Sequence, residues 1–110
     1  MKVEVTTIDE VKVVALDGEI DASTAAAVQQ QILLLTQPDV RLLLDMTRVP
    51  YMSSAGLRVL LSAYRQVAAK NGRIVLVGLD DEIRDTMDTT GFLPFFTVRA
   101  DVPAGLEALR

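Results

Sequence analysis

The segment from Val40 to Gly72 constrains the fold most, because a proline separates a strand pattern from a helix pattern. Val40 and the leucines at 42–44 form an apolar run with the length of a buried strand. Pro50 prevents a continuous helix into the residues that follow, so a helix must start after Tyr51. Apolar side chains then recur at three- and four-residue steps, as on one face of a helix: Leu57, Leu60, Leu61, Tyr64 and Ala68. Asn71-Gly72 predicts the helix end, with Gly72 in the left-handed conformation of a C-cap.

The N-terminal third has the pattern of a β-hairpin followed by a helix. Residues 2–6 alternate between polar and apolar types, as in a half-exposed edge strand. A second strand pattern follows across the polar turn Asp9-Glu10, which predicts antiparallel pairing: Val11, Val13, Val14 and Leu16. Asp21 or Ser23 is expected to cap a helix that ends before Pro38 and has one apolar face: Ala25, Val28, Ile32 and Leu35.

The C-terminal third continues the alternation of strand and helix patterns. Residues 73–78 form an apolar strand pattern. The acidic run 80–82 marks a helix start, where the dipole favours negative charge, and Gly91 is expected as its C-cap. Phe95, Phe96 and Val98 suggest a last short strand, and residues 102–110 a terminal helix.

This order of elements defines the fold class. Helices that alternate with strands after a hairpin imply parallel pairing through crossover connections. We therefore predict one α/β domain over residues 1–110, with a mixed, mostly parallel β-sheet of about five strands, about four α-helices and an N-terminal β-hairpin.

Two serines fall at the predicted start of the central helix, and the residues alone leave two interpretations open. Ser53 or Ser54 could act only as an N-cap, which stabilises a helix by about 0.5–2 kcal/mol relative to alanine. Alternatively, one hydroxyl could accept a phosphoryl group, because a helix N-terminus offers free N–H donors and the positive end of the dipole. Gly56 favours the second interpretation, since a residue without Cβ lets a phosphate or another protein's backbone approach closely.

Two motifs around this segment resemble those of STAS-domain anti-sigma factor antagonists. The first resembles the family signature that follows the third strand: Asp45, Val49, Met52, Ser54, Gly56 and Leu57. The second, Leu16–Asp21, looks like the family's motif at the end of the second strand. The resemblance implies the STAS fold, and it places Ser54 at the family's phosphoacceptor position. Ser53 stands where the family usually has Asp, and Ala55 replaces a second hydroxyl residue, so Ser53 is the second choice of acceptor.

The same resemblance implies a function by partner switching. The unphosphorylated protein would bind an anti-sigma factor that is also a serine-protein kinase, phosphorylation at Ser54 would release it, and a PP2C-type phosphatase would restore binding. The partner-binding surface implied for this chain consists of seven residues: Asp21, Met52, Ser53, Gly56, Leu57, Arg58 and Leu61.

Composition excludes several other function classes. Without histidine or cysteine, the chain lacks the usual nucleophile systems, zinc ligands and redox disulfides, so we expect no catalytic residues, metal or cofactor. A net charge of −4 and dispersed basic residues argue against nucleic acid. The N-terminus is not a signal peptide and no apolar run could span a bilayer, so a cytoplasmic protein without membrane contact is expected.

Two rival functions remain from the sequence. In a non-switching STAS adaptor subunit of a transporter or a larger signalling assembly, Ser54 would be only a helix cap. A small-ligand or nucleotide-binding enzyme is the other rival, although the residue types for catalysis and a glycine-rich phosphate loop are missing.

Overall fold

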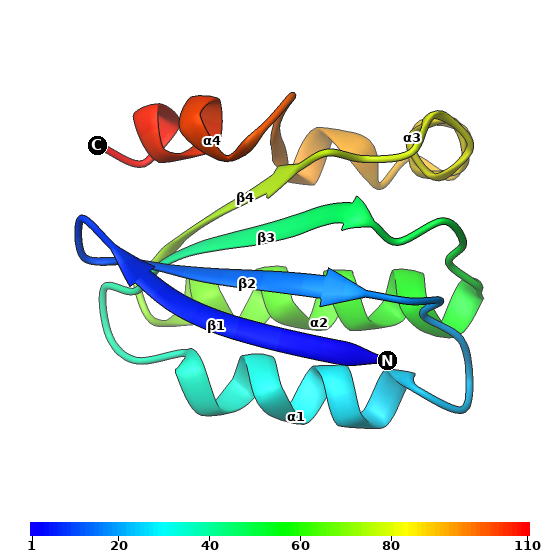
Figure 1. Cartoon of the computed structure of the whole chain (residues 1–110), viewed down its shortest axis with the longest axis horizontal. Helices are drawn as coiled ribbons and strands as arrows, with labels where there is room; N and C mark the ends of the chain where they lie inside the picture. Colours follow the sequence, from blue (N-terminus) through cyan, green and yellow to red (C-terminus); the bar gives the residue numbers. More distant parts are fainter.

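The computed structural model describes residues 1–110. Its five strands form one sheet in the order β1-β2-β3-β4-β5, and helices cover both faces (Figure 1). The elements follow one another along the chain as β1 (Lys2–Ile8), β2 (Val11–Asp17), α1 (Ala25–Leu35), β3 (Arg41–Arg48), α2 (Ser54–Ala69), β4 (Arg73–Val77), α3 (Asp81–Thr89), a 3-10 helix (Leu93–Phe95), β5 (Thr97–Arg99) and α4 (Val102–Ala108).

Strand pairing confirms the predicted fold class. β1 and β2 pair antiparallel, and the other neighbours, from β2 to β5, pair parallel. Asp9 and Glu10 have φ angles of 50° and 67°. Both angles positive is the conformation that two-residue hairpins prefer, because its twist matches that of the strands. The N-terminal hairpin, the mostly parallel five-stranded sheet and the four α-helices were therefore predicted correctly.

The hydrophobic core has two parts, one on each face of the sheet. Successive side chains of a strand point to opposite faces, so in β3 Leu42 and Leu44 join one part while Leu43 joins the other. The larger part packs against α1, α2 and α3, and the smaller part packs under α4 around Leu109. β3 is therefore buried on both faces, which explains its uninterrupted apolar run.

The helices each bury one side against the sheet. Val28 and Ile32 of α1 are buried, as are Ile83 and Met87 of α3, in agreement with the predicted apolar faces. None of the helices combines the length and the apolar composition that crossing a lipid bilayer requires.

Helix ends agree with the sequence prediction in α3 and differ in α2. Gly91, with φ of 80°, follows the end of α3 as predicted, and the next N–H, of Phe92, donates to Met87 C=O at 2.9 Å. At the end of α2 the left-handed residue is Asn71, with φ of 57°, so the prediction for Gly72 was wrong. Gly72 serves close packing instead, because a Cβ there would lie 2.6 Å from Val40 C=O.

Two further local predictions need correction. The N-cap of α1 is Thr24, not Asp21 or Ser23, and no side chain caps that helix. Phe95 belongs to the 3-10 helix at Pro94, and Phe96 precedes β5, so the last strand is shorter than predicted. Proline favours such a tight turn because its φ is fixed near the helical value.

Candidate functional site

The site lies where β2 and β3 end, and backbone hydrogen bonds there join two loops. Ile20 and Met52 form an isolated parallel bridge beyond the two strands. Ile20 N–H donates to Tyr51 C=O at 3.1 Å, and Ser53 N–H donates to Ile20 C=O at 2.9 Å. The segment around residues 19–21 is therefore held beside the start of α2.

The two serines at the start of α2 have different environments. Ser53 is the N-cap, with an extended backbone, but its side chain accepts no capping hydrogen bond. Its Oγ is buried and has no hydrogen-bond partner. Ser54 is the first residue of the helix and is exposed. The predicted place of both serines at the helix start is confirmed, whereas the capping bond expected for them is absent.

Gly56 is buried in the first turn of α2 and packs against the joined loops. A Cβ at this position would lie 2.2 Å from Met52 Cγ and 2.9 Å from Ile20 C=O. Such distances are far below van der Waals contact, so a side chain would push the helix away from the loop. The glycine is thus required by the protein's own packing, which corrects the expectation that its missing side chain serves the approach of another molecule.

The family of this chain follows from a match that covers nearly the whole sequence. Residues 2–104 match the model of the STAS domain. The chain belongs to the STAS domain family. Residues of both motifs, Ile20 and Met52, form the bridge at the site, so the family's two motifs meet in space.

Relatives of this STAS domain have regulatory names. BtrV of Bordetella bronchiseptica is 30% identical over 111 residues, which span 100% of this chain and 96% of that protein. The anti-sigma-B factor antagonist of Listeria monocytogenes is 31% identical over 83 residues, or 74% of this chain and 73% of that protein. The crystal structure of an anti-sigma factor antagonist from Mycobacterium paratuberculosis superimposes with a TM-score of 0.88 at 29% identity, covering 99% of this chain and 93% of that one.

The residues predicted to bind a partner divide into buried and accessible groups in this STAS domain. Gly56 is buried, and Met52 and Leu57 are each only 8% exposed, so these three leave little surface for contact. The accessible or partly accessible members form the outer surface of the site: Asp21, Ser53, Arg58 and Leu61. The assignment of all seven to partner binding stays a prediction.

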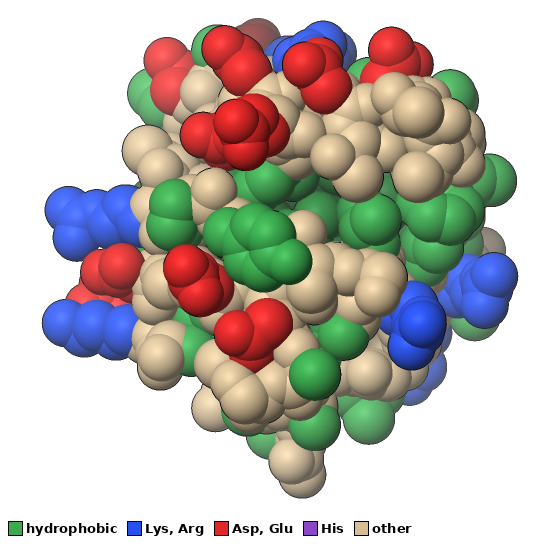
Figure 2. Space-filling model, turned by 90° about the vertical axis from the view of Figure 1, so that its right-hand side faces the viewer, with side chains coloured by type: hydrophobic (Ala, Val, Ile, Leu, Met, Phe, Trp, Pro, Cys, Tyr) green, Lys and Arg blue, Asp and Glu red, His purple; other side chains and the backbone are tan.

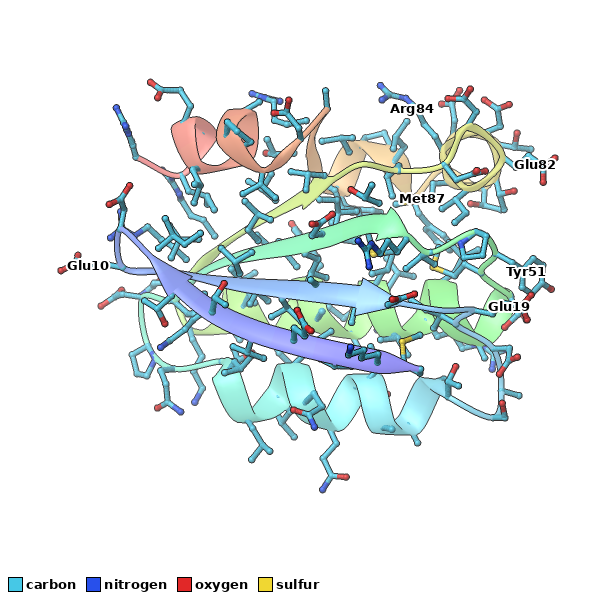
Figure 3. All side chains as sticks on the ribbon, viewed as in Figure 1. Glu10, Glu19, Tyr51, Glu82, Arg84 and Met87 are labelled. Carbon is cyan, nitrogen blue, oxygen red and sulfur yellow. The ribbon has the colours of Figure 1, made fainter.

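Sequence reasoning missed two surface residues of the STAS domain at this end. Tyr51 is 52% exposed, although its neighbour Met52 is buried. Figure 3 shows Tyr51 and Glu19 on the same end of the molecule, both pointing outward. Tyr51 follows Pro50 and lies outside the helical period, so an exposed aromatic was its only signal in the sequence.

Acidic side chains surround this end of the STAS domain. Figure 2 looks onto it and shows hydrophobic side chains with acidic side chains above and below them. Asp21 accepts hydrogen bonds from the Ser23 hydroxyl at 2.6 Å and the Ser23 N–H at 2.9 Å. These bonds, the hydroxyl first, lower the pKa of Asp21, so its charge is retained at neutral pH. Its contribution to stability is present above the ordinary pKa of aspartate and is lost as pH falls through the lowered value.

The buried hydroxyl of Ser53 leads to a stability prediction opposite to that for a capping serine. Ser53→Ala should leave the free energy of unfolding unchanged or raise it by up to about 1 kcal/mol, because an unpaired polar group leaves the interior. Asp80→Ala is the matched control, since Asp80 does cap α3 by accepting a bond from Glu82 N–H at 2.9 Å. The control should lose about 0.5–2 kcal/mol in urea unfolding. An equal loss in both variants would mean that Ser53 caps α2 after all.

Proposed function

We propose that this STAS domain is an anti-sigma factor antagonist that acts by partner switching in the cytoplasm. The unphosphorylated form binds an anti-sigma factor that is also a serine kinase, and phosphorylation of Ser54 releases it. One observation carries the proposal: of the two serines at the start of α2, Ser54 is exposed, while Ser53 Oγ is buried. The names of the relatives support the antagonist role.

The position of Ser54 suits a phosphate in the free protein. The first N–H groups of an α-helix have no acceptor within the helix, and Leu57 N–H is the first here to find one, at Ser53 C=O. The free N–H groups and the positive end of the dipole stabilise a dianion at this place. The phosphorylated domain should therefore remain folded.

The same phosphate opposes binding when a partner covers the site. A phosphoryl group adds about −1.5 to −2 charges, which a packed interface around a neutral hydroxyl would have to bury. A penalty of roughly 3–4 kcal/mol weakens affinity several-hundred-fold, since about 1.4 kcal/mol corresponds to a factor of ten.

The contact surface in this proposal is the accessible rim of the site. Arg58, Leu61, Asp21 and Tyr51 face the partner, while Met52, Gly56 and Leu57 hold this surface in place from below. The kinase supplies ATP and magnesium, because this chain needs to present only a hydroxyl. A PP2C-type phosphatase then restores binding by removing the phosphate.

A labelling experiment tests which serine is the acceptor. Incubation with the cognate kinase and Mg-ATP should label wild type and Ser53→Ala equally and leave Ser54→Ala unlabelled, with the site assigned by mass spectrometry of the tryptic peptides. Label on Ser54→Ala but not on Ser53→Ala would move the acceptor to Ser53. No label on any protein, with a kinase active on its own substrates, would favour the adaptor function.

A further inference from the structure

The free edge of β1 differs from the opposite edge of the sheet in length. β5 forms that opposite edge and has three residues, whereas β1 has seven and pairs on one side only. A long edge presents unpaired N–H and C=O groups to any second strand, whereas a very short edge does not. Val5 lies at the middle of this edge and is 41% exposed.

The hairpin register determines which backbone groups face outward. Ile8 and Val11 flank the two-residue turn and form a hydrogen-bonded pair, and such pairs alternate with non-bonded ones along an antiparallel ladder. Lys2, Glu4, Thr6 and Ile8 therefore direct their backbone groups to β2. The outward groups belong to Val3, Val5 and Thr7, a set symmetric about Val5.

This symmetry makes the edge complementary to itself. In an antiparallel pair of two β1 strands centred on Val5, Val5 faces Val5 of the second copy and Val3 faces Thr7. All three outward residues of each chain then find partners at once. A closed dimer with twofold symmetry needs such a surface, in which the same patch serves both subunits.

The charges of β1 agree with the Val5-centred register. On the other face of the strand, Lys2 would lie opposite Ile8 and Glu4 opposite Thr6, so no like charges meet. A register centred on Glu4 would instead place two glutamates directly opposite each other, which is unfavourable. We propose that β1 pairs with β1 of a second copy of this chain about Val5, which joins two sheets into one.

Two variants of equal charge test this dimer by sedimentation velocity over a wide range of protein concentration. Wild type should shift from monomer to dimer as its concentration rises. Val5→Lys places two lysines across the twofold axis and should weaken dimerisation by at least about tenfold. Thr6→Lys, on the same strand, faces Glu4 of the second copy and should dimerise at least as well as wild type.

A charge-reversal mixture separates pairing from damage to the fold. Val5→Lys and Val5→Glu should each remain monomeric, and an equal mixture of the two should form a heterodimer. Circular dichroism of each variant should match wild type. A wild-type protein that stays monomeric at every concentration, or a Val5→Lys protein that dimerises like wild type, would overturn the proposal. The assay uses neither a kinase nor Ser54, so its outcome is independent of the switching function.

Discussion

Replacing Ser54 by aspartate is expected to weaken binding to the cognate anti-sigma factor by about a hundredfold while the melting temperature stays close to that of wild type. Aspartate places one negative charge at an exposed first helical position, where the dipole stabilises it by typically about 0.3–1 kcal/mol. In the complex, the same charge would be desolvated against a surface that fits a neutral hydroxyl. Affinity by titration calorimetry and thermal unfolding should be measured on one preparation.

Ser54→Asn is the matched control for this prediction, because asparagine has nearly the shape of aspartate without its charge. It should bind much more tightly than Ser54→Asp. An equal loss in both variants would assign the effect to side-chain size. Full affinity in a well-folded Ser54→Asp protein would count against switching and favour the adaptor subunit.

Gly56→Ala is expected to destabilise the fold by about 1–3 kcal/mol, although alanine is the better helix former. The added Cβ would lie 2.2 Å from Met52 Cγ and 2.9 Å from the backbone oxygen of Ile20. The backbone oxygen cannot move away without breaking its bond from Ser53 N–H. Urea unfolding of the purified variant measures the loss.

A double-mutant cycle identifies the clash. Met52→Ala removes the nearer atom, so Gly56→Ala should cost less in that background than in wild type, with an interaction energy of about 0.5–3 kcal/mol. Additive losses would show that Met52 is not the obstacle. A Gly56→Ala protein as stable as wild type would return this glycine to the approach of a partner.

The alternation of elements could be predicted because it depends on local periodicity. The apolar period identified β3 and α2, and the hairpin followed from a polar two-residue turn. The boundary of β5 was missed because the apolar Phe95 and Phe96 fit a strand, a 3-10 turn or a core contact equally well. In the fold they pack against Tyr64, with ring centroids 5.5 Å and 5.7 Å apart.

Features of the site that depend on contacts distant in sequence could not be predicted. The sequence places Ser53 at the helix start, but it does not show that its Oγ points into a buried space. The role of Gly56 depends on Ile20, which lies far away in the chain and reaches the helix only through the bridge to Met52. Likewise, either residue of Asn71-Gly72 could be left-handed, and the contact of Gly72 with Val40 decides between them.

The affinity of the cognate anti-sigma factor for the protein before and after stoichiometric phosphorylation of Ser54 tests partner switching most directly. Both forms should come from one preparation, and phosphatase treatment of the phosphorylated sample provides the control for irreversible damage. We expect binding to fall several-hundred-fold on phosphorylation and to return fully after phosphatase treatment. Equal affinity of the two forms would contradict the account.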